Sequence, residues 1–351
     1  MNQPISSGTK TSTLALWAGI VFSFLFTGVI WLAGQWLADV PHLPDAGASW
    51  YYWILPQPTF WSRATAWGGY LLHQIASWGL IYYAQTRVKR YTTGLHLVNV
   101  LALATNALFI LLHFVQTHIW YDGLAQDTSI FSSQGSVIIM LVWVLLMENS
   151  RRGMFFGKRV PIAQNVIRAA RTYHGYVFSW ATIYTFWYHP LENSSGHLIG
   201  FVYMFMLLLQ GSLFYTRAHL NRWWTFALEV MVLFHGTLVA LMQSGSQGIW
   251  PMFFFGFFGI VIITQMHGLG LSKAARWALF ALYAGAVVVV YNWRGWDRLN
   301  EIARIPLIEY AAALVLAGLI WLTLRLIDWF KSRPDRPKAI KEHLDGANEP
   351  A

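Results

Sequence analysis

Long runs of apolar residues follow one another along the chain, and each run ends at charged residues or at a cluster of Pro and Gly. Crossing about 30 Å of hydrocarbon takes roughly 20 apolar residues of helix, and a helix satisfies its own backbone hydrogen bonds in lipid. The pattern therefore predicts an all-α integral membrane protein of about ten transmembrane helices. They are expected at residues 14–37, 64–84, 95–118, 132–147, 173–189, 197–216, 224–243, 251–269, 277–293 and 307–329.

The positively charged residues indicate how these helices are oriented. When successive connections are assigned to the two sides in turn, 20 of the 24 Lys and Arg fall on one side. The other side holds only Arg63, Arg294, Arg298 and Arg304. Cytoplasmic loops retain positive charge, whereas short translocated loops avoid it. Both termini are therefore expected in the cytoplasm, with the protein in a bacterial inner (plasma) membrane and membrane lipids around it.

The composition agrees with a membrane protein and excludes several kinds of chemistry. Hydrophobic residues make up 56% of the 351 residues and charged residues 11%, against about a quarter charged in soluble domains. The net charge of +9 follows the insertion pattern, so no nucleic-acid partner is expected. The chain has no Cys, which excludes disulfides, iron–sulfur clusters and c-type haem.

The chain is expected to form one polytopic transmembrane domain at residues 1–330, followed by a disordered cytoplasmic tail at 331–351 that is rich in Lys, Asp and Pro. An aromatic, Pro-broken outward loop at about 38–63 is predicted to lie along the interface as a lid or an amphipathic segment. Glu229, in the seventh predicted helix, is expected to pair with Arg222. No P-loop, GxGxxG, GxSxG or HExxH motif points to an established chemistry.

Histidine points most directly to a site, because ionisable groups inside a bilayer are costly. Several of the 12 His lie at the two ends of predicted helices, as b-type cytochromes with a haem near each leaflet require. The predicted haem ligands are His113 and His189 near the outer leaflet, and His96 and His174 near the inner leaflet. Within a helix the paired positions lie about 60° to about 100° apart around the axis. Two haems held between the same two helices would need both ligands of each helix on one face. A single outer haem does not need this alignment, which favours the outer pair.

A second set of polar residues lies on two outward connections. His118 and Asp122 follow the third predicted helix, and Glu192 and His197 lie where the fifth joins the sixth. Imidazole and carboxylate groups bind divalent metal ions such as zinc, copper or iron, so these four residues are candidate metal ligands. Their spacing matches no compact metal motif, and a polar rim with histidines as hydrogen-bonding anchors is the simpler interpretation.

Four hypotheses follow for the function. The first is electron transfer through b-type haem, or with a quinone or another redox partner, based on the histidines near both leaflets. The second is a transporter or receptor for a small molecule, with Asn, Gln, His and Glu229 lining a cavity. The third is a metal-dependent intramembrane enzyme acting on a lipid. The fourth is an assembly or scaffold subunit of a membrane complex. The histidine pattern places electron transfer first.

Overall fold

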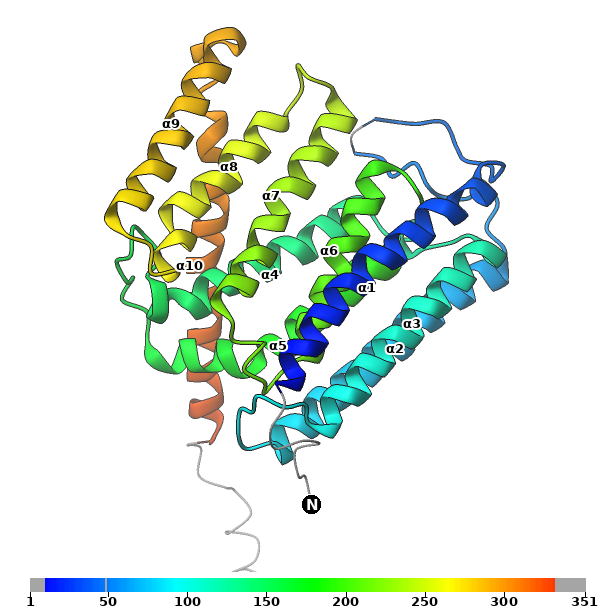
Figure 1. Cartoon of the computed structure of the whole chain (residues 1–351), viewed down its shortest axis with the longest axis horizontal. Coiled ribbons are helices and arrows are strands. Elements are labelled where there is room, and N and C mark those ends of the chain that lie inside the picture. Colours follow the sequence, from blue (N-terminus) through cyan, green and yellow to red (C-terminus); the bar gives the residue numbers. More distant parts are fainter. Residues whose placement is uncertain (1–9, 48, 332–351) are drawn as a thin grey trace, which may run out of the picture.

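The computed structural model describes residues 10–47 and 49–331, which fold into ten α-helices with no β-strand among them (Figure 1). In chain order the helices are α1 (Thr11–Ala33), α2 (Phe60–Arg87), α3 (Leu97–Trp120), α4 (Ile130–Arg152), α5 (Gln164–Tyr188), α6 (Ser195–Ser212), α7 (Arg222–Ser244), α8 (Trp250–Ile263), α9 (Lys273–Arg294) and α10 (Glu301–Lys331). Each contains most of one predicted helix. The predicted tail at 331–351 lies, except for Lys331, outside the described residues.

Eight helical stretches in the described part of the chain are long and apolar enough to cross a bilayer. The helices α2 and α5 are not among them, although they have 28 and 25 residues, because Arg, Gln, Thr and Tyr side chains interrupt their apolar runs. The chain is thus an all-α membrane protein. Two of the ten expected spans differ from the rest in being more polar.

Local capping explains where several helices begin and end. Thr59 and Ser62 form a capping box at the start of α2, and the Asn221 side chain accepts from the first backbone N–H groups of α7. Such side chains satisfy backbone donors that have no partner within the helix. At the other end, α4 stops at Gly153 and α7 at Gly245, both with positive φ angles of 75° and 67°, where glycine costs least.

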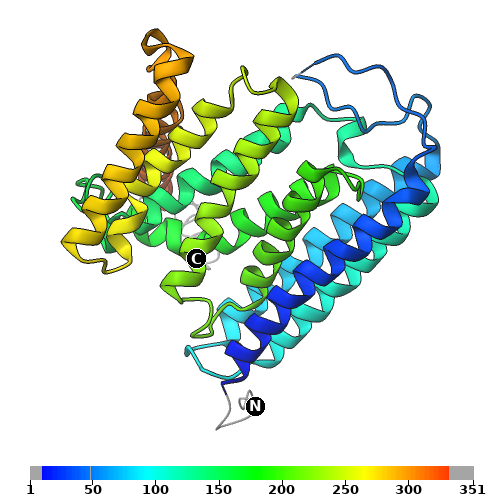
Figure 2. The same ribbon diagram turned by 45° about the horizontal axis from the view of Figure 1, so that its top comes forward.

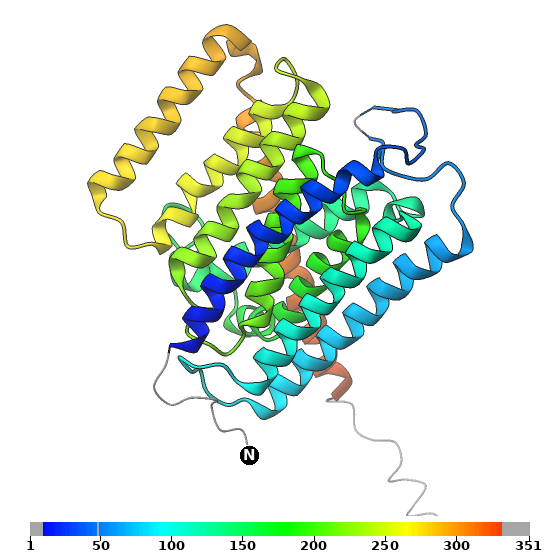
Figure 3. The same ribbon diagram turned by 45° about the vertical axis from the view of Figure 1, so that its right-hand side comes forward.

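The helices pack as a bundle in which α5 is central. The helices α2 and α3 lie side by side along one edge with α1 near them, where α1 packs on α6, and α9 lies at the opposite edge against α8 (Figures 1 and 2). Figure 3 shows α9 standing apart from the other helices. By contrast, α5 packs against α2, α4, α6 and α10, and its residues 181–188 are all buried. The first residues of α1 and the last of α10 lie at one end of the bundle, called here the inner end (Figure 1).

Candidate functional site

The loop between α1 and α2 folds back over the outer end of the bundle and buries Tyr51, which is 8% exposed. Its hydroxyl lies 2.8 Å from Nδ1 of His189 and 2.8 Å from Nε2 of His197. The two imidazole rings are 5.4 Å apart. A phenol hydroxyl has one proton to donate, so one histidine accepts from Tyr51 while the other donates to it. The loop therefore covers both histidines and orders them.

His113, on α3, completes what we call the outer histidine cluster: Tyr51, His113, His189 and His197. Its Nε2 lies 2.8 Å from the backbone carbonyl oxygen of His189, and its Nδ1 lies 3.0 Å from Oε1 of Gln116. The two predicted outer haem ligands are thus neighbours, but His189 turns its backbone toward His113. An iron bound to His113 would have to displace one of these two oxygen partners.

The predicted inner haem ligands do not share partners. His96 is the N-cap residue of α3, and its Nε2 lies 3.2 Å from Oγ1 of Thr92. His174, on α5, lies beside His219 in the connection between α6 and α7, with 6.3 Å between ring centroids. The pair that the structure brings together near the inner end is therefore His174 with His219.

The four candidate metal ligands each have a different protein partner. His118 donates from Nδ1 to the Phe114 carbonyl at 2.8 Å. His197 contacts Tyr51 and Ser194. Within residues 10–47 and 49–331, no group of three or more His, Asp or Glu side chains lies in position to hold a metal ion.

The two carboxylates of this set belong to a polar rim at the outer end. Asp122 forms an ion pair with Arg63 at 2.9 Å. Glu192 accepts a 2.5 Å hydrogen bond from the Tyr121 hydroxyl. Burial raises the pKa of both carboxyls, and for Asp122 the adjacent guanidinium opposes this rise. This arrangement fits the interpretation of these residues as a hydrogen-bonded rim.

A further buried histidine, His73, lies deeper, between the outer cluster and the middle of the bundle. His73 of α2 is completely buried. Its Nδ1 accepts from Nε1 of Trp187 at 3.3 Å, and its Nε2 lies 2.7 Å from Oδ1 of Asn106. The Trp187 ring in turn lies 4.3 Å from the ring of His113. His73 and Trp187 therefore connect His113, in the outer cluster, to Asn106.

A cavity opens from the inner end among α2, α3, α4, α5, α6 and α7, with Asn106 in its lining. It has two adjoining parts of about 540 Å³ and about 580 Å³, and the lining residues that they share include Tyr91, Arg171, His174 and His219. We call the first part the mouth and the second the inner chamber. Both volumes lie in the range of small-molecule sites, roughly 300–1,000 Å³.

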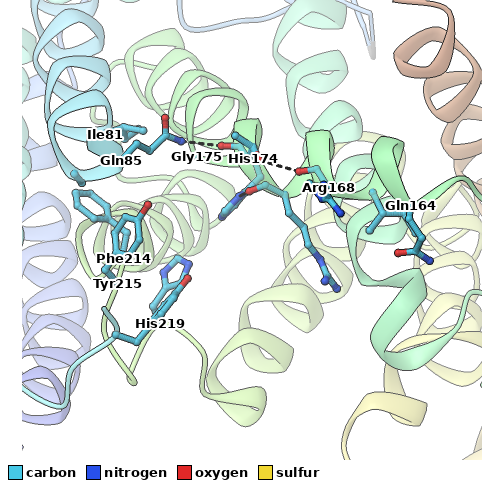
Figure 4. A pocket seen from close by; sticks show the side chains of 14 residues that line it. Ile81, Gln85, Gln164, Arg168, His174, Gly175, Phe214, Tyr215 and His219 are labelled. Atoms are coloured by element: carbon cyan, nitrogen blue, oxygen red, sulfur yellow. Dashed lines mark hydrogen bonds between the residues drawn. The ribbon is translucent and has the colours of Figure 1, made fainter. Parts of the chain in front are cut away.

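The mouth is basic. Figure 4 places Gln164 and Arg168 on one side of it and Phe214, Tyr215 and His219 on the other. In the described part of the chain, the Arg168 guanidinium has no ion pair or hydrogen bond. Arg171 donates only to uncharged oxygens, the Met147 carbonyl at 3.0 Å and Ser150 Oγ at 2.7 Å. Two guanidinium charges therefore face the mouth without a carboxylate partner.

The two histidines of the mouth present acceptors. Nδ1 of His174 lies 2.6 Å from the Arg171 carbonyl oxygen, and Nδ1 of His219 lies 3.0 Å from the Gln210 carbonyl oxygen. Each Nδ1 must therefore carry the proton, which leaves Nε2 as an acceptor. Burial lowers the pKa of His219 to about 4, so this imidazole is neutral near pH 7.

The inner chamber is mainly apolar, and its lining includes Met140, Leu141, Phe178 and Leu207. Glu229 also lines it, and here the predicted partner is wrong. Arg152 of α4 takes the place expected for Arg222, with its Nη1 at 3.0 Å and 2.8 Å from the two oxygens of Glu229. The tertiary fold brings Arg152 to α7, so Glu229 needs no partner on its own helix. This pair neutralises the charge at that wall.

Sequence reasoning missed the mouth because it began α5 too late. The predicted helix starts at residue 173, whereas α5 starts at Gln164. Arg168 and Arg171 therefore lie on a helix that lines a cavity and not on a loop. The available signal was the segment after Pro161, which contains three Ala and two Arg and no Gly or Pro up to Gly175.

Comparison of the chain with protein-family models, with curated proteins and with solved structures finds no match.

Proposed function

We propose that this protein is a membrane transporter or receptor that binds an anionic amphiphile, a molecule with an acidic head and an apolar tail. The observation that carries the proposal is the cavity itself, in which a mouth with Arg168 and Arg171 leads into an apolar chamber. Membrane-protein sites for polar substrates place charged side chains where they face a cavity or a partner.

The mouth has the chemistry to hold an acidic head. Guanidinium groups bind phosphate and carboxylate oxygens through several N–H donors. The Nε2 atoms of His174 and His219 are acceptors, so they suit a hydroxyl group, such as that of a singly ionised phosphate. The head is therefore expected at the inner interface, where it stays hydrated until it meets the arginines.

The chamber has the chemistry to hold an apolar tail. Its volume of about 580 Å³ matches a chain of roughly ten to twenty carbon atoms when each carbon takes about the volume of one water molecule, roughly 30 Å³. Both carboxylates of the chamber lining are paired with an arginine, Glu229 with Arg152 and Glu148 with Arg151. For a tail that comes from water, burial there gains about 0.8 kcal/mol for each methylene group.

The topology that accompanies this proposal has ten spans with both termini in the cytoplasm of a bacterial inner membrane. Its support is the distribution of Lys and Arg, of which only four lie on outward connections. The polar helices α2 and α5 count as spans because α5 is buried among other helices and α2 packs along α3 and α5. In this topology the mouth opens toward the cytoplasm.

The other hypotheses receive less support from the geometry. Electron transfer by haem at His113 and His189 requires breaking a hydrogen bond of His113, and His96 and His174 lack a common partner. A metal-dependent lipid enzyme needs His118, Asp122, Glu192 and His197 to leave their separate partners. An absorbance spectrum of the purified protein tests the haem, since a Soret band would favour electron transfer. If the protein is a scaffold subunit, its deletion should cause the loss of a membrane complex that contains it.

Binding to the protein in phosphatidylcholine nanodiscs tests the proposal. We expect decyl phosphate to bind, and decyltrimethylammonium, which has the same tail and the opposite charge, not to bind. Replacing Arg171 by Gln should weaken decyl phosphate binding about tenfold or more, because a hydrogen bond to a charged group contributes about 1.5–3 kcal/mol. Arg87→Gln, at the end of α2 and outside the cavity lining, is the matched control.

Equal binding of both decyl compounds, or an equal loss in the two Arg variants, would contradict the proposal. A membrane lipid and a free amphiphile share the same head chemistry, and a second arm separates them. Mass spectrometry of the purified protein should detect a co-purifying anionic lipid that Arg171→Gln reduces if the ligand comes from the membrane. If it comes from the cytoplasm, decyl phosphate binds without displacing lipid.

A further inference from the structure

The inner chamber contains two deeply buried hydroxyl groups that have no hydrogen-bond partner. They belong to Thr182 on α5 and Tyr203 on α6, which line the chamber and are 5% and 2% exposed. In the described part of the chain, neither hydroxyl takes part in a hydrogen bond. A buried hydroxyl without a partner is costly. These two groups, called here the deep hydroxyls, are therefore positions at which a ligand gains by making hydrogen bonds.

Most other polar side chains of the chamber lining are satisfied by the protein. Those that hydrogen-bond within the protein include Asn106, Ser179, Gln210 and Thr225. The carboxylates of Glu148 and Glu229 are paired with arginines. Ser77 also lacks a partner among the described residues, but it is only partly buried. The deep hydroxyls thus differ from the rest of the lining in being both buried and free.

Thr182 also differs from other threonines of the helices. A threonine inside a helix commonly donates to the carbonyl four residues before it, as Thr172 of the same helix does to Arg168 at 2.9 Å. Thr182 makes no such bond within the described chain. Both deep hydroxyl oxygens still reach open space, whereas Oγ1 of Thr237 is fully enclosed without a partner. Because Thr182 and Tyr203 line the chamber, that space is the chamber.

The deep hydroxyls lie at nearly the same depth in the bundle. At the outer end, where α5 ends and α6 begins, the rings of His189 and His197 are 5.4 Å apart. Thr182 comes seven residues before His189, and Tyr203 comes six residues after His197. At about 1.5 Å of rise per residue, both positions lie about 9–10 Å inward of the histidines. One group on a ligand is therefore at the right depth for both hydroxyls.

The position of Arg171 on α5 gives the distance of this level from the mouth. Arg171 comes 11 residues before Thr182, so the two lie about 16 Å apart along the helix axis. An extended alkyl chain advances about 1.25 Å for each carbon atom, because its C–C bonds of about 1.5 Å form a zigzag. About a dozen carbon atoms therefore separate a head at Arg171 from a group at Thr182.

We infer that the ligand of the chamber is bifunctional: besides its acidic head, it carries a hydroxyl or carbonyl oxygen about a dozen carbon atoms along its tail, which hydrogen-bonds to Thr182 and Tyr203. This inference rests on the proposed function, in which Arg168 and Arg171 hold the head. It adds a second polar position to the ligand. Threonine and tyrosine hydroxyls both donate and accept, so a ligand hydroxyl can donate to one and accept from the other.

The same arrangement makes the chamber selective for the position of the oxygen. A site with buried hydrogen-bonding groups discriminates against a ligand that lacks the matching group, because the site groups then stay unpaired. Phe178 lies between Arg171 and Thr182 on α5 and also lines the chamber. A ligand oxygen near the middle of the tail meets such apolar side chains and loses its hydration without replacement.

Binding of two isomeric ligands to the protein in phosphatidylcholine nanodiscs tests the inference. The isomers are 12-hydroxydodecyl phosphate and 6-hydroxydodecyl phosphate, with dodecyl phosphate as the reference for the head and tail. The isomers have the same head, size and polarity and differ only in where the hydroxyl lies. We expect the 12-hydroxy isomer to bind about tenfold or more tightly than the 6-hydroxy isomer, because only its hydroxyl finds buried partners.

Conservative variants identify the groups that bind the hydroxyl. The ratio of the two affinities should fall several-fold in Thr182→Val and in Tyr203→Phe, which remove one hydroxyl each, and should reach about one in the double variant. Thr185→Val is the matched control. Thr185 lies on the same helix outside the chamber lining, and its Oγ1 is 2.9 Å from Oγ of Ser136. This variant should keep the wild-type ratio.

The outcomes separate this inference from the proposed function. If dodecyl phosphate binds but the wild type binds both isomers equally, the inference is wrong and the proposed function stands. If the isomers differ but Thr182→Val and Tyr203→Phe keep the wild-type ratio, another group binds the hydroxyl and the inference is again wrong. If none of the three phosphates binds, the proposed function fails and the inference fails with it. The wild-type comparison needs no variant, so it decides the inference even if a variant does not fold.

Discussion

Replacing Glu229 by Gln is predicted to destabilise the protein by about 3–5 kcal/mol, the cost of removing one partner from a buried ion pair. The pair is well shielded, with side-chain exposures of 2% for Arg152 and 11% for Glu229. Nε and Nη2 of Arg152 are also buried and have no hydrogen-bond partner. Gln keeps the size of the side chain and one acceptor, so the change removes mainly the charge that compensates Arg152.

Removing Arg152, the positive partner, should cost less than removing the charge of Glu229. Arg152→Met leaves a buried carboxylate, which can take up a proton and become neutral, whereas an arginine in a protein stays charged. The double variant Arg152→Met/Glu229→Gln leaves no uncompensated charge and should be more stable than Glu229→Gln alone. The expected order of stability is therefore wild type, then the double variant and Arg152→Met, then Glu229→Gln.

A double-mutant cycle measures this order by denaturant unfolding in bicelles near pH 7. The coupling energy isolates the pair only if each single change introduces no new contact. A Glu229→Gln variant within about 0.5 kcal/mol of wild type, the usual range for unimportant surface positions, would refute the buried ion pair. A double variant less stable than Glu229→Gln would refute the argument from uncompensated charge.

Three further predictions concern single side chains. Tyr51→Phe removes the hydroxyl shared by two histidines and should lower the unfolding free energy by about 1–3 kcal/mol; an unchanged melting temperature would contradict the shared bond. Gly69→Ala places a methyl group against the Trp187 ring and should lower the unfolding free energy by about 1–3 kcal/mol. Gly68→Ala is the control, because its methyl group meets nothing within 4 Å. Equal shifts of the melting temperature in the two variants would contradict the close packing. Because the pKa of His219 is lowered to about 4, only the unfolded chain takes up a proton here as the pH falls from about 6.5 toward 4, so stability falls in that window. In unfolding titrations His219→Gln should lose less stability than wild type over that range, and a parallel loss would contradict it.

Eight of the helical stretches were predictable because each contains an apolar run long enough to cross a bilayer, and α2 and α5 were found from shorter apolar runs that polar side chains interrupt. The expected helix at 95–118 corresponds to Leu97–Trp120, and that at 224–243 to Arg222–Ser244. The largest shift is at the start of α5, where charged residues marked the end of the apolar run. Arg side chains can extend from the membrane interface toward water, so the helix continues after its hydropathy ends. The basic mouth lies on that extension.

Side-chain partners were less predictable than helices, because packing order cannot be derived from hydropathy. Glu229 was assigned to Arg222, a neighbour on the same helix face, but pairs with Arg152, 77 positions away. The structure places His113, His189 and His197 close together at the outer end, and Tyr51 of the outward loop connects two of them. A residue in a long loop has no periodic pattern that would place it beside a given helix.

The position and charge selectivity of the bound amphiphile can be measured with one labelling experiment. The natural chain has no Cys, so maleimide labels only a cysteine that is introduced by substitution. Ser179→Cys places it in the lining of the inner chamber, and Ser246→Cys places it on an exposed loop outside that lining. The rate of maleimide labelling is followed in phosphatidylcholine nanodiscs. Decyl phosphate should protect the cysteine at position 179 and not that at 246, and decyltrimethylammonium should protect neither. No protection at position 179, or the same protection by both compounds, would contradict binding of an anionic amphiphile in the chamber.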